Sequence, residues 1–380
     1  MGFLDWEDHI NSLEKMEGWH ALEKQQAREA LEYLQRVLGD DFLARSRERV
    51  PSIGHHPMLA KLSNFAPSSR RDLTRFAEYL RALEDSQNHG KVLARLHDAV
   101  QFNHDELLIK LAAKLVWQGL RASFEPTMPE RKNLRQPDLK LDGPLTGETV
   151  FLEVATQAPA KRWREATDAN SAVFNAVFGI SLDLCFSGRW HKTPSKQALG
   201  DLLERIKASA RRALNERSID FVQEENTLQM AVCHRGQRAT LLDPWSKERG
   251  LSCGFLGPTA VRNDTFRLKL KIQRKQGQLP RDNANVIVIL APDAFLGLGG
   301  VRRVIGEVEE EVFKYDHVHF TIVHGEYVDD REVPFVGQTG GHQYTRRIVD
   351  GTVENDLLLL NRDSRMKLSP NLLAKFYRVF

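Results

Sequence analysis

The sequence predicts an α/β protein in which a mixed sheet is flanked by helices and preceded by a helical region. Residues 1–97 hold apolar residues at helical spacing, whereas the middle of the chain alternates short β-branched runs with longer amphipathic segments. Strands that alternate with helices are typical of an α/β sheet rather than of two packed sheets. We therefore expect a helical N-terminal region at 1–97, an α/β domain at 98–330, and a C-terminal extension at 331–380 packed on it.

The composition of the 380 residues, with 41% hydrophobic and 28% charged, is that of a globular protein. A formal net charge of +3 is too small to indicate a nucleic-acid binder by itself. No apolar run is long enough to span a membrane, and the acidic N-terminus is unlike a signal peptide. Three cysteines without a CxxC pair favour a reduced, cytoplasmic protein.

Two helices stand out in the N-terminal region, at Ala21–Leu38 and Arg70–Leu83, and Gly39 supplies a C-terminal stop for the first. The following segments are predicted by the period of their apolar residues. Strands are expected at Ala122–Glu125, Asp138–Leu141, Thr149–Ala155, Ile180–Phe186, Leu228–Cys233, Asn285–Ala291 and His317–His324. Helices are expected at Asn103–Gly119, Lys196–Asn215, Asp264–Gln278, Val301–Lys314 and, near the end of the chain, Asn371–Tyr377.

The helix Asn103–Gly119 buries a stripe made of Leu107, Leu111 and Leu115. Glu106 lies in its first turn, where the helix dipole favours an acid. The favourable interaction with the helix dipole is a structural explanation for a glutamate at this position.

Two acidic residues are expected to meet on one face of a hairpin. Side chains alternate along a strand, so Asp138 points away from Leu139, and Glu153 points away from Leu152. Residues 143–147 form a turn that makes the two strands antiparallel neighbours. Paired strands would place the two carboxylates side by side.

A helix with Glu106, a strand, the pair Pro137-Asp138, a turn and an apolar strand with Glu153 together resemble the PD-(D/E)xK nuclease superfamily. The resemblance implies a restriction-endonuclease-like fold, in which the two carboxylates and the carbonyl of Val154 hold Mg²⁺ or Mn²⁺ against the scissile phosphate. Glu106 would be the helix acid that assists the metal. Carboxylates suit this task because Mg²⁺ prefers oxygen ligands and activates water.

The sequence departs from that pattern at Ala155, where the superfamily has its lysine. That lysine supports the nucleophile and the negative transition state. Its absence leaves two interpretations, an inactive site or a replacement from elsewhere. The candidate replacements are Lys140 on the same strand face as Asp138, Gln157 or Thr156, and Lys271 or Lys275 on a distant helix.

Two basic clusters could contact a phosphate backbone, although each also fits a solvated surface or loop. The first cluster is Lys161, Arg162 and Arg164, and the second is Arg267, Lys271, Arg274 and Lys275. His317 and His319 share a strand face but lack an evident third metal ligand, so we expect ordinary strand histidines. Gly297–Gly300 lacks the last glycine of a dinucleotide-binding loop and is predicted to be a turn.

These observations predict a metal-dependent nuclease that hydrolyses DNA phosphodiester bonds, and the resemblance suggests restriction, repair or defence against mobile elements. Asp138, Glu153, Lys140 and Glu106 are the expected catalytic residues. The alternative is an inactive nuclease-fold protein that binds DNA or a protein. DNA is the expected partner, with a homodimer and a protein bound through residues 1–97 as further expectations, and no membrane.

Overall fold

The computed structural model describes residues 5–46, 56–64, 66–128, 136–144, 147–157, 161–251, 264–291, 300–328, 335–339, 342–349 and 352–380. The chain forms two compact units. Unit 1 comprises Met1–Gln157 and Asp264–Phe380, and unit 2 comprises Ala158–Asn263. These units do not follow the predicted boundaries at residues 97 and 330, because the helical region and the C-terminal strands both pack into unit 1.

Helices fill the first part of unit 1: α1 (Trp6–Ser12), the 3-10 turn η1 (Leu13–Lys15), α2 (Ala21–Leu38), α3 (Phe42–Arg45), α4 (Pro57–Ser63), α5 (Pro67–Ala82), α6 (His89–Arg95) and α7 (Phe102–Trp117). The bounds of α2 are the predicted ones. α5 begins three residues earlier than predicted, because Pro67 fits the first helical turn, where its missing N–H is not needed. α2 packs on α5, and α5 packs on α7, so the helical region continues into the layer that covers the sheet.

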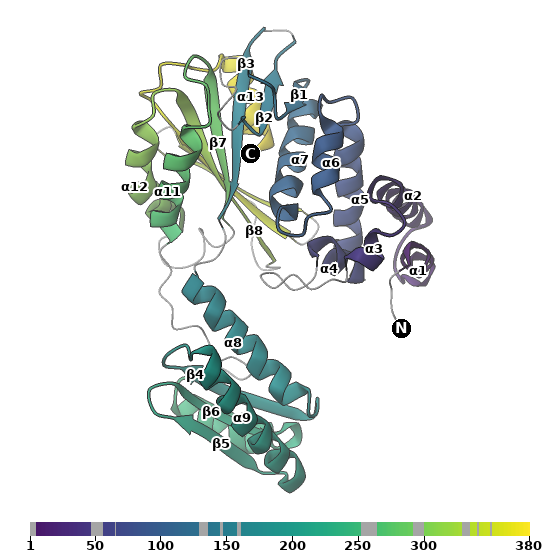
Figure 1. The fold of residues 1–380 in the computed structure, drawn as a ribbon, viewed down its shortest axis with the longest axis vertical. Helices are drawn as coiled ribbons and strands as arrows, with labels where there is room; N and C mark the ends of the chain where they lie inside the picture. The colour runs from purple at the N-terminus through teal and green to yellow at the C-terminus, as the bar shows by residue number, and fades with distance from the viewer. Residues whose placement is uncertain are drawn as a thin grey trace. The chain divides into compact units, whose positions relative to one another are not determined.

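The described part of unit 1 contains a mixed sheet of eight strands (Figure 1). In spatial order they are β1 (Arg121–Phe124), β2 (Leu139–Asp142), β3 (Thr149–Thr156), β7 (Ala284–Leu290), β8 (Val318–Val328), β11 (Thr352–Leu360), β10 (His342–Val349) and β9 (Phe335–Thr339). β3, β7 and β8 are parallel, and the remaining neighbours pair antiparallel. The α/β class predicted from the sequence is therefore confirmed.

Helices cover both faces of this sheet, with α7 on one face and α11 (Asp264–Gln276) and α12 (Gly300–Phe313) on the other (Figure 1). Alternate residues of β3 enter two separate cores, as the sequence pattern indicates. Val154 belongs to the core under α7, and Phe151 and Ala155 belong to the core under α11 and α12. Glu153 lies two positions from both Phe151 and Ala155, so its side chain points to the same face of the sheet, which is the face covered by α11.

α11 follows β3 in unit 1 and precedes β7, which is the parallel neighbour of β3. Parallel neighbours need such a crossover connection. Unit 2 is inserted into this connection, between the end of β3 and the start of α11. The insertion separates the glutamate strand from the helix that covers it.

The last part of the chain completes the sheet rather than forming an extension packed on it. β11 pairs with β8 over nine residues, from Thr352 opposite Val328 to Leu360 opposite Phe320. The final helix, α13 (Pro370–Val379), is close to the predicted Asn371–Tyr377 and buries Phe376 in the core under α7. Extensive strand pairing is the reason why the predicted division at residue 330 is not observed.

Unit 2 is a small α/β unit made of α8 (Lys161–Phe178), β4 (Leu184–Trp190), α9 (Lys196–Glu216), β5 (Ile219–Glu224), β6 (Leu228–His234), the short turns η3 (Arg235–Gln237) and η4 (Arg238–Leu242), and α10 (Asp243–Glu248). Its antiparallel sheet has the order β4-β6-β5. α8 and α9 bury their apolar residues against one sheet face. Over all described residues, no helix is both long and apolar enough to cross a membrane.

Candidate active site

Asp138 and Glu153 meet where β2 separates from β3, a point that we call the strand fork. The last residues paired between these strands are Leu139 and Leu152. Asp138 precedes Leu139 and Glu153 follows Leu152, so both acids lie one position beyond this last pair, where β2 is no longer paired with β3. Asp138 is 5% exposed and Glu153 is fully buried, so both carboxylates require partners.

Backbone groups fix Asp138 at the strand fork. The N–H of Val154 donates to Asp138 Oδ2 at 2.8 Å. The N–H of Glu125, just after β1, donates to the Asp138 carbonyl at 3.1 Å. Glu125 has a positive φ of 41°, an uncommon conformation for a residue with a side chain. The aspartate is thus held from both neighbouring strands.

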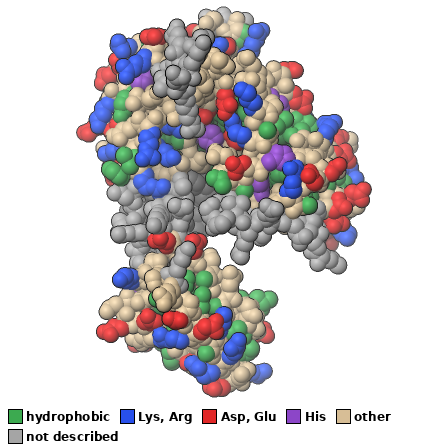
Figure 2. All heavy atoms as spheres, viewed as in Figure 1, with side chains coloured by type: hydrophobic (Ala, Val, Ile, Leu, Met, Phe, Trp, Pro, Cys, Tyr) green, Lys and Arg blue, Asp and Glu red, His purple; other side chains and the backbone are tan. Residues whose placement is uncertain are grey.

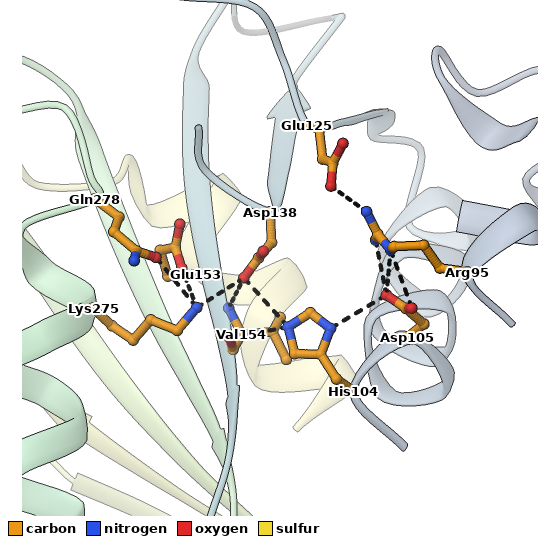
Figure 3. A network of polar contacts seen from close by, with 9 residues as sticks. All are labelled: Arg95, His104, Asp105, Glu125, Asp138, Glu153, Val154, Lys275 and Gln278. Atoms are coloured by element: carbon orange, nitrogen blue, oxygen red, sulfur yellow. Dashed lines mark hydrogen bonds and ion pairs between the residues drawn. The ribbon is translucent and has the colours of Figure 1, made fainter. Parts of the chain in front are cut away.

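Lys275 on α11 reaches both carboxylates (Figure 3). Its Nζ donates to Glu153 Oε2 at 2.5 Å and to Asp138 Oδ2 at 3.3 Å. Gln278, just after α11, lies beside them, and with its amide NH₂ facing the carboxylate it donates to Glu153 Oε2 at 2.6 Å. A lysine from another element therefore lies beside the two carboxylates, whereas position 155 of β3 holds an alanine.

His104 approaches the same site from α7, on the opposite side of the sheet from Lys275 (Figure 3). Its Nε2 lies 3.2 Å from the carbonyl oxygen of Val154 and 3.6 Å from Asp138 Oδ2. Its Nδ1 lies 3.3 Å from Asp105 Oδ1. An imidazole nitrogen and a backbone carbonyl thus adjoin the aspartate carboxylate.

Behind His104, a second layer of charge fixes Asp105, which is fully buried. Arg95 at the end of α6 donates to Asp105 through Nε at 3.1 Å and through Nη2 at 2.8 Å. Arg95 Nη1 also pairs with Glu125. A series of polar contacts therefore runs from Glu125 through Arg95 and Asp105 to His104, and it links the strand fork to the start of α7.

The pKa values of the two carboxyl groups shift in opposite directions, although both groups contact Lys275. Burial opposes ionisation of Asp138, but His104 and Lys275 outweigh it and hold its pKa well below the usual range. Burial, together with the charge of Asp138, raises the pKa of Glu153. Burial also opposes the charge on His104, but Asp105 and Asp138 raise its pKa to about 9. Unequal acids at one site are typical of functional clusters.

Glu106 takes a different place from the one expected. Its carboxylate lies 2.7 Å from Nζ of Lys61 on α4, facing the N-terminal helices. Each helical residue turns about 100° around the axis, so Glu106 is rotated by about 200° from His104. His104 and Asp105, rather than Glu106, are the helix residues near the fork.

Lys140 also differs from expectation. Its Nζ pairs with Asp142 Oδ2 at 2.8 Å on the same strand. Asp142 additionally accepts a bond from Thr149 at 2.6 Å, which holds this pair at the far end of the hairpin. Lys275 was among the distant candidates, and the structure places that lysine at the carboxylates.

The two basic clusters are only partly described. α8 contains Lys161, Arg162 and Arg164, but their side chains lie outside the described residues. On α11, Arg274 is exposed, Arg267 and Lys271 are partly exposed, and Lys275 is buried in the site rather than on the surface. Figure 2 shows blue side chains over the region where Figure 1 places α11.

The paired strand histidines each have a separate partner. His317 lies 3.1 Å from the carbonyl oxygen of Gln276, and His319 accepts from the N–H of Leu368 at 3.0 Å. These contacts agree with the expectation of ordinary structural histidines. Gly297–Gly299 of the predicted turn lies outside the described residues.

The strand fork offers donors that fit a divalent cation in kind. They are the carboxylates of Asp138 and Glu153, the carbonyl of Val154 and, once its proton is lost, Nε2 of His104. Within the described ranges, no group of three or more acidic, histidine or cysteine side chains forms a preassembled metal cage. The Lys275 ammonium lies between the two carboxylates. Oxygen ligands suit Mg²⁺, and the imidazole nitrogen shifts the preference toward Mn²⁺.

Comparison with known proteins adds no relative from which a role could be transferred: no family model, curated protein or solved structure matches the chain.

Proposed function

We propose that the protein is a metal-dependent nuclease that hydrolyses DNA phosphodiester bonds at the strand fork. The observation that carries the proposal is Lys275, whose ammonium contacts both Asp138 and Glu153. It supplies the charge that the superfamily motif requires and that Ala155 lacks. The order α7, β1, Asp138 before β2, and Glu153 in β3 also follows the resemblance to the PD-(D/E)xK superfamily and its restriction-endonuclease-like fold.

The residues of the fork divide the work. Asp138, Glu153 and the Val154 carbonyl would hold Mg²⁺ or Mn²⁺, and His104 would add a nitrogen donor only after it loses its Nε2 proton. When bound there, such a cation supplies a water of lowered pKa and a positive charge for the phosphate oxygens. Lys275 Nζ holds a further positive charge beside the carboxylates and stabilises the anionic transition state.

A second candidate is a nuclease-fold module without catalysis. Each cation of the site already pairs with two acids of the same chain. Arg95 pairs with Asp105 and Glu125. His104 pairs with Asp105 and Asp138, and Lys275 pairs with Asp138 and Glu153, so the strand fork is part of a connected ion network. A network of this kind can serve structure alone. This candidate predicts folding without cation binding.

The deciding experiment measures Mn²⁺ and Mg²⁺ binding by calorimetry and cleavage of single- and double-stranded DNA by the full chain. The proposal expects one cation site and metal-dependent cleavage, both lost in Asp138→Asn. Cleavage that persists in Asp138→Asn would place the chemistry elsewhere. A chain that folds but binds neither cation supports the inactive module.

A further inference from the structure

Two cysteine thiols lie next to each other inside unit 2, far from the strand fork in sequence. Cys185 on β4 and Cys233 on β6 are direct register partners in the antiparallel pair. Their sulfur atoms are 3.4 Å apart. Cys185 Sγ is also 3.7 Å from the carbonyl oxygen of Cys233. The sulfurs therefore face one another across neighbouring strands.

The backbone at this point already has the spacing that a disulfide needs. Opposed residues of an antiparallel pair have Cα atoms about 4.5 or 5.5 Å apart, depending on their hydrogen bonding. Disulfides span Cα separations of about 4.4 to 6.8 Å. Both kinds of opposed pair fall in this range, so rotation of the side chains is enough to bring the sulfurs into bonding distance.

The surroundings make the two thiols unequal. Cys233 is fully buried, whereas Cys185 keeps 9% of its surface exposed. The hydrogen bond with Cys233 lowers the pKa of Cys185 against the effect of burial, and Arg238 adds to this lowering. Apolar residues pack around the pair, among them Leu242 and Trp245. Cys185 is thus the less buried of the two residues, and we expect an outside reagent to react first with its thiol, with Cys233 beside it.

We propose that Cys185 and Cys233 form a reversible disulfide by exchange with a small-molecule disulfide. The Cys185 thiolate attacks one sulfur of the reagent, whose S–S bond breaks and releases one thiolate. The Cys233 thiolate then attacks the Cys185 sulfur of the mixed disulfide, which forms the protein disulfide and releases the second thiolate. The reagent gains two electrons, and the two cysteine protons pass to the released thiols. This proposal is independent of the nuclease function.

The bond would join β4 to β6 and close the chain between residues 185 and 233. A cross-link of this length restricts the unfolded chain and so stabilises the folded one. Because both strands belong to unit 2, we expect slower hydrogen exchange in β4 and β6 of the oxidised protein. The amides of β3 and β7 in unit 1 should exchange at unchanged rates.

The experiment equilibrates the full chain with oxidised and reduced glutathione, followed by alkylation under denaturing conditions and mass spectrometry. We expect the oxidised protein to lose the mass of two hydrogen atoms, to yield a cross-linked peptide containing Cys185 and Cys233, and to revert fully with reductant. Cys253→Ser should behave like wild type, and Cys185→Ser should form no intramolecular disulfide.

Two outcomes would overturn the proposal. In the first, both thiols remain alkylatable in the most oxidising buffer. In the second, oxidation links Cys253 instead, so that Cys253→Ser abolishes the bond. Because Cys253→Ser retains both Cys185 and Cys233, the result does not depend on whether Cys185→Ser folds.

Discussion

The charged residues at the strand fork make ion pairs with partners that are distant in the sequence. Lys275 contacts Glu153 across 122 residues of sequence and contacts Asp138 as well. Asp105 contacts Arg95 and His104 in complete burial. A buried charge is stable only with partners, so each of these side chains depends on the others.

If the nuclease proposal is correct, Lys275→Met reduces kcat by about 10²- to 10³-fold, the range for loss of one preorganised transition-state contact. Lys140→Met is the matched control, because Lys140 pairs with Asp142 in the same hairpin. We expect that control to retain nearly full activity in the DNA cleavage assay. The reverse ranking of the two variants would return the missing lysine's role to Lys140.

Arg95→Met should destabilise the fold by about 3 kcal/mol, because it leaves the carboxylate of Asp105 in the core with a weaker set of partners. The value is at the low end for a buried pair, since His104 still contacts Asp105. Arg45→Met breaks an exposed pair with Asp41 and should cost less than about 1 kcal/mol. Urea denaturation measures both, and equal costs would contradict the network described here.

At the scale of elements, α7 connects the strand fork to β11, which lies three strands from β3 in the sheet. Its first turn supplies His104, and its later turns supply Lys110 and Lys114, which contact Glu354 on β11. The distances from the two Nζ atoms to the Glu354 carboxylate are 2.6 and 3.3 Å. α7 is therefore fixed to the sheet by an ion cluster as well as by its apolar stripe.

This cluster predicts a defined loss of stability in acid. Burial opposes ionisation of Glu354, but Lys110 and Lys114 lower its pKa to about 2, below the ordinary 4.5. The stabilisation is thus complete above about pH 4.5 and disappears as the pH falls toward 2. The unfolding free energy of Glu354→Gln should be lower than that of wild type at pH 7, and the two should converge as the pH falls through about 2. A difference independent of pH would rule out this ionic origin.

Local sequence patterns predict most elements of unit 1 and locate two of the acids. The periods of α2, α7 and β3 depend on neighbouring residues, and these segments were predicted almost to their bounds. Lys275 was only one of several candidate lysines, because its contact with Glu153 depends on how a distant helix packs. β10 and β11 were not identified, because their inward positions include polar residues such as Glu354 and Asp356 that obscure the strand pattern.

His104 was missed for a different reason. The first turn of α7 holds His104, Asp105 and Glu106 in succession, and sequence alone does not fix which of them faces the sheet. The leucine stripe gives a signal that could have decided it. Leu108 and Leu111 lie within about a third of a turn of His104 and share its face, whereas Glu106 lies on the other side.

At the scale of the molecule, the two units have separate apolar cores. The buried residues of the unit 2 cores lie between Ala169 and Leu242, and the cores of unit 1 contain no residue from this range. A core that is complete within one unit can unfold independently of another. Cooperative unfolding of the whole chain is therefore not required.

Scanning calorimetry of the full chain should resolve two transitions. Ile206→Ala removes a buried side chain from α9 and should lower only the unit 2 transition, at a cost of about 2–5 kcal/mol. Leu108→Ala, at a buried position of α7, should lower only the other transition by a similar amount. A single transition that shifts in both variants would contradict the division into units.

The insertion of unit 2 between β3 and α11 also affects how the protein folds. β3 and β7 must pair across the whole inserted segment, so the chain has to close a long loop before the central sheet can form. If unit 2 collapses first around its own core, it shortens the effective loop and lowers the entropic barrier to that closure. The state in which only unit 2 is folded is then an intermediate on the way to the strand fork. A core mutation of unit 2 such as Ile206→Ala should therefore slow the formation of the strand fork, although unit 2 contributes no residue to that site.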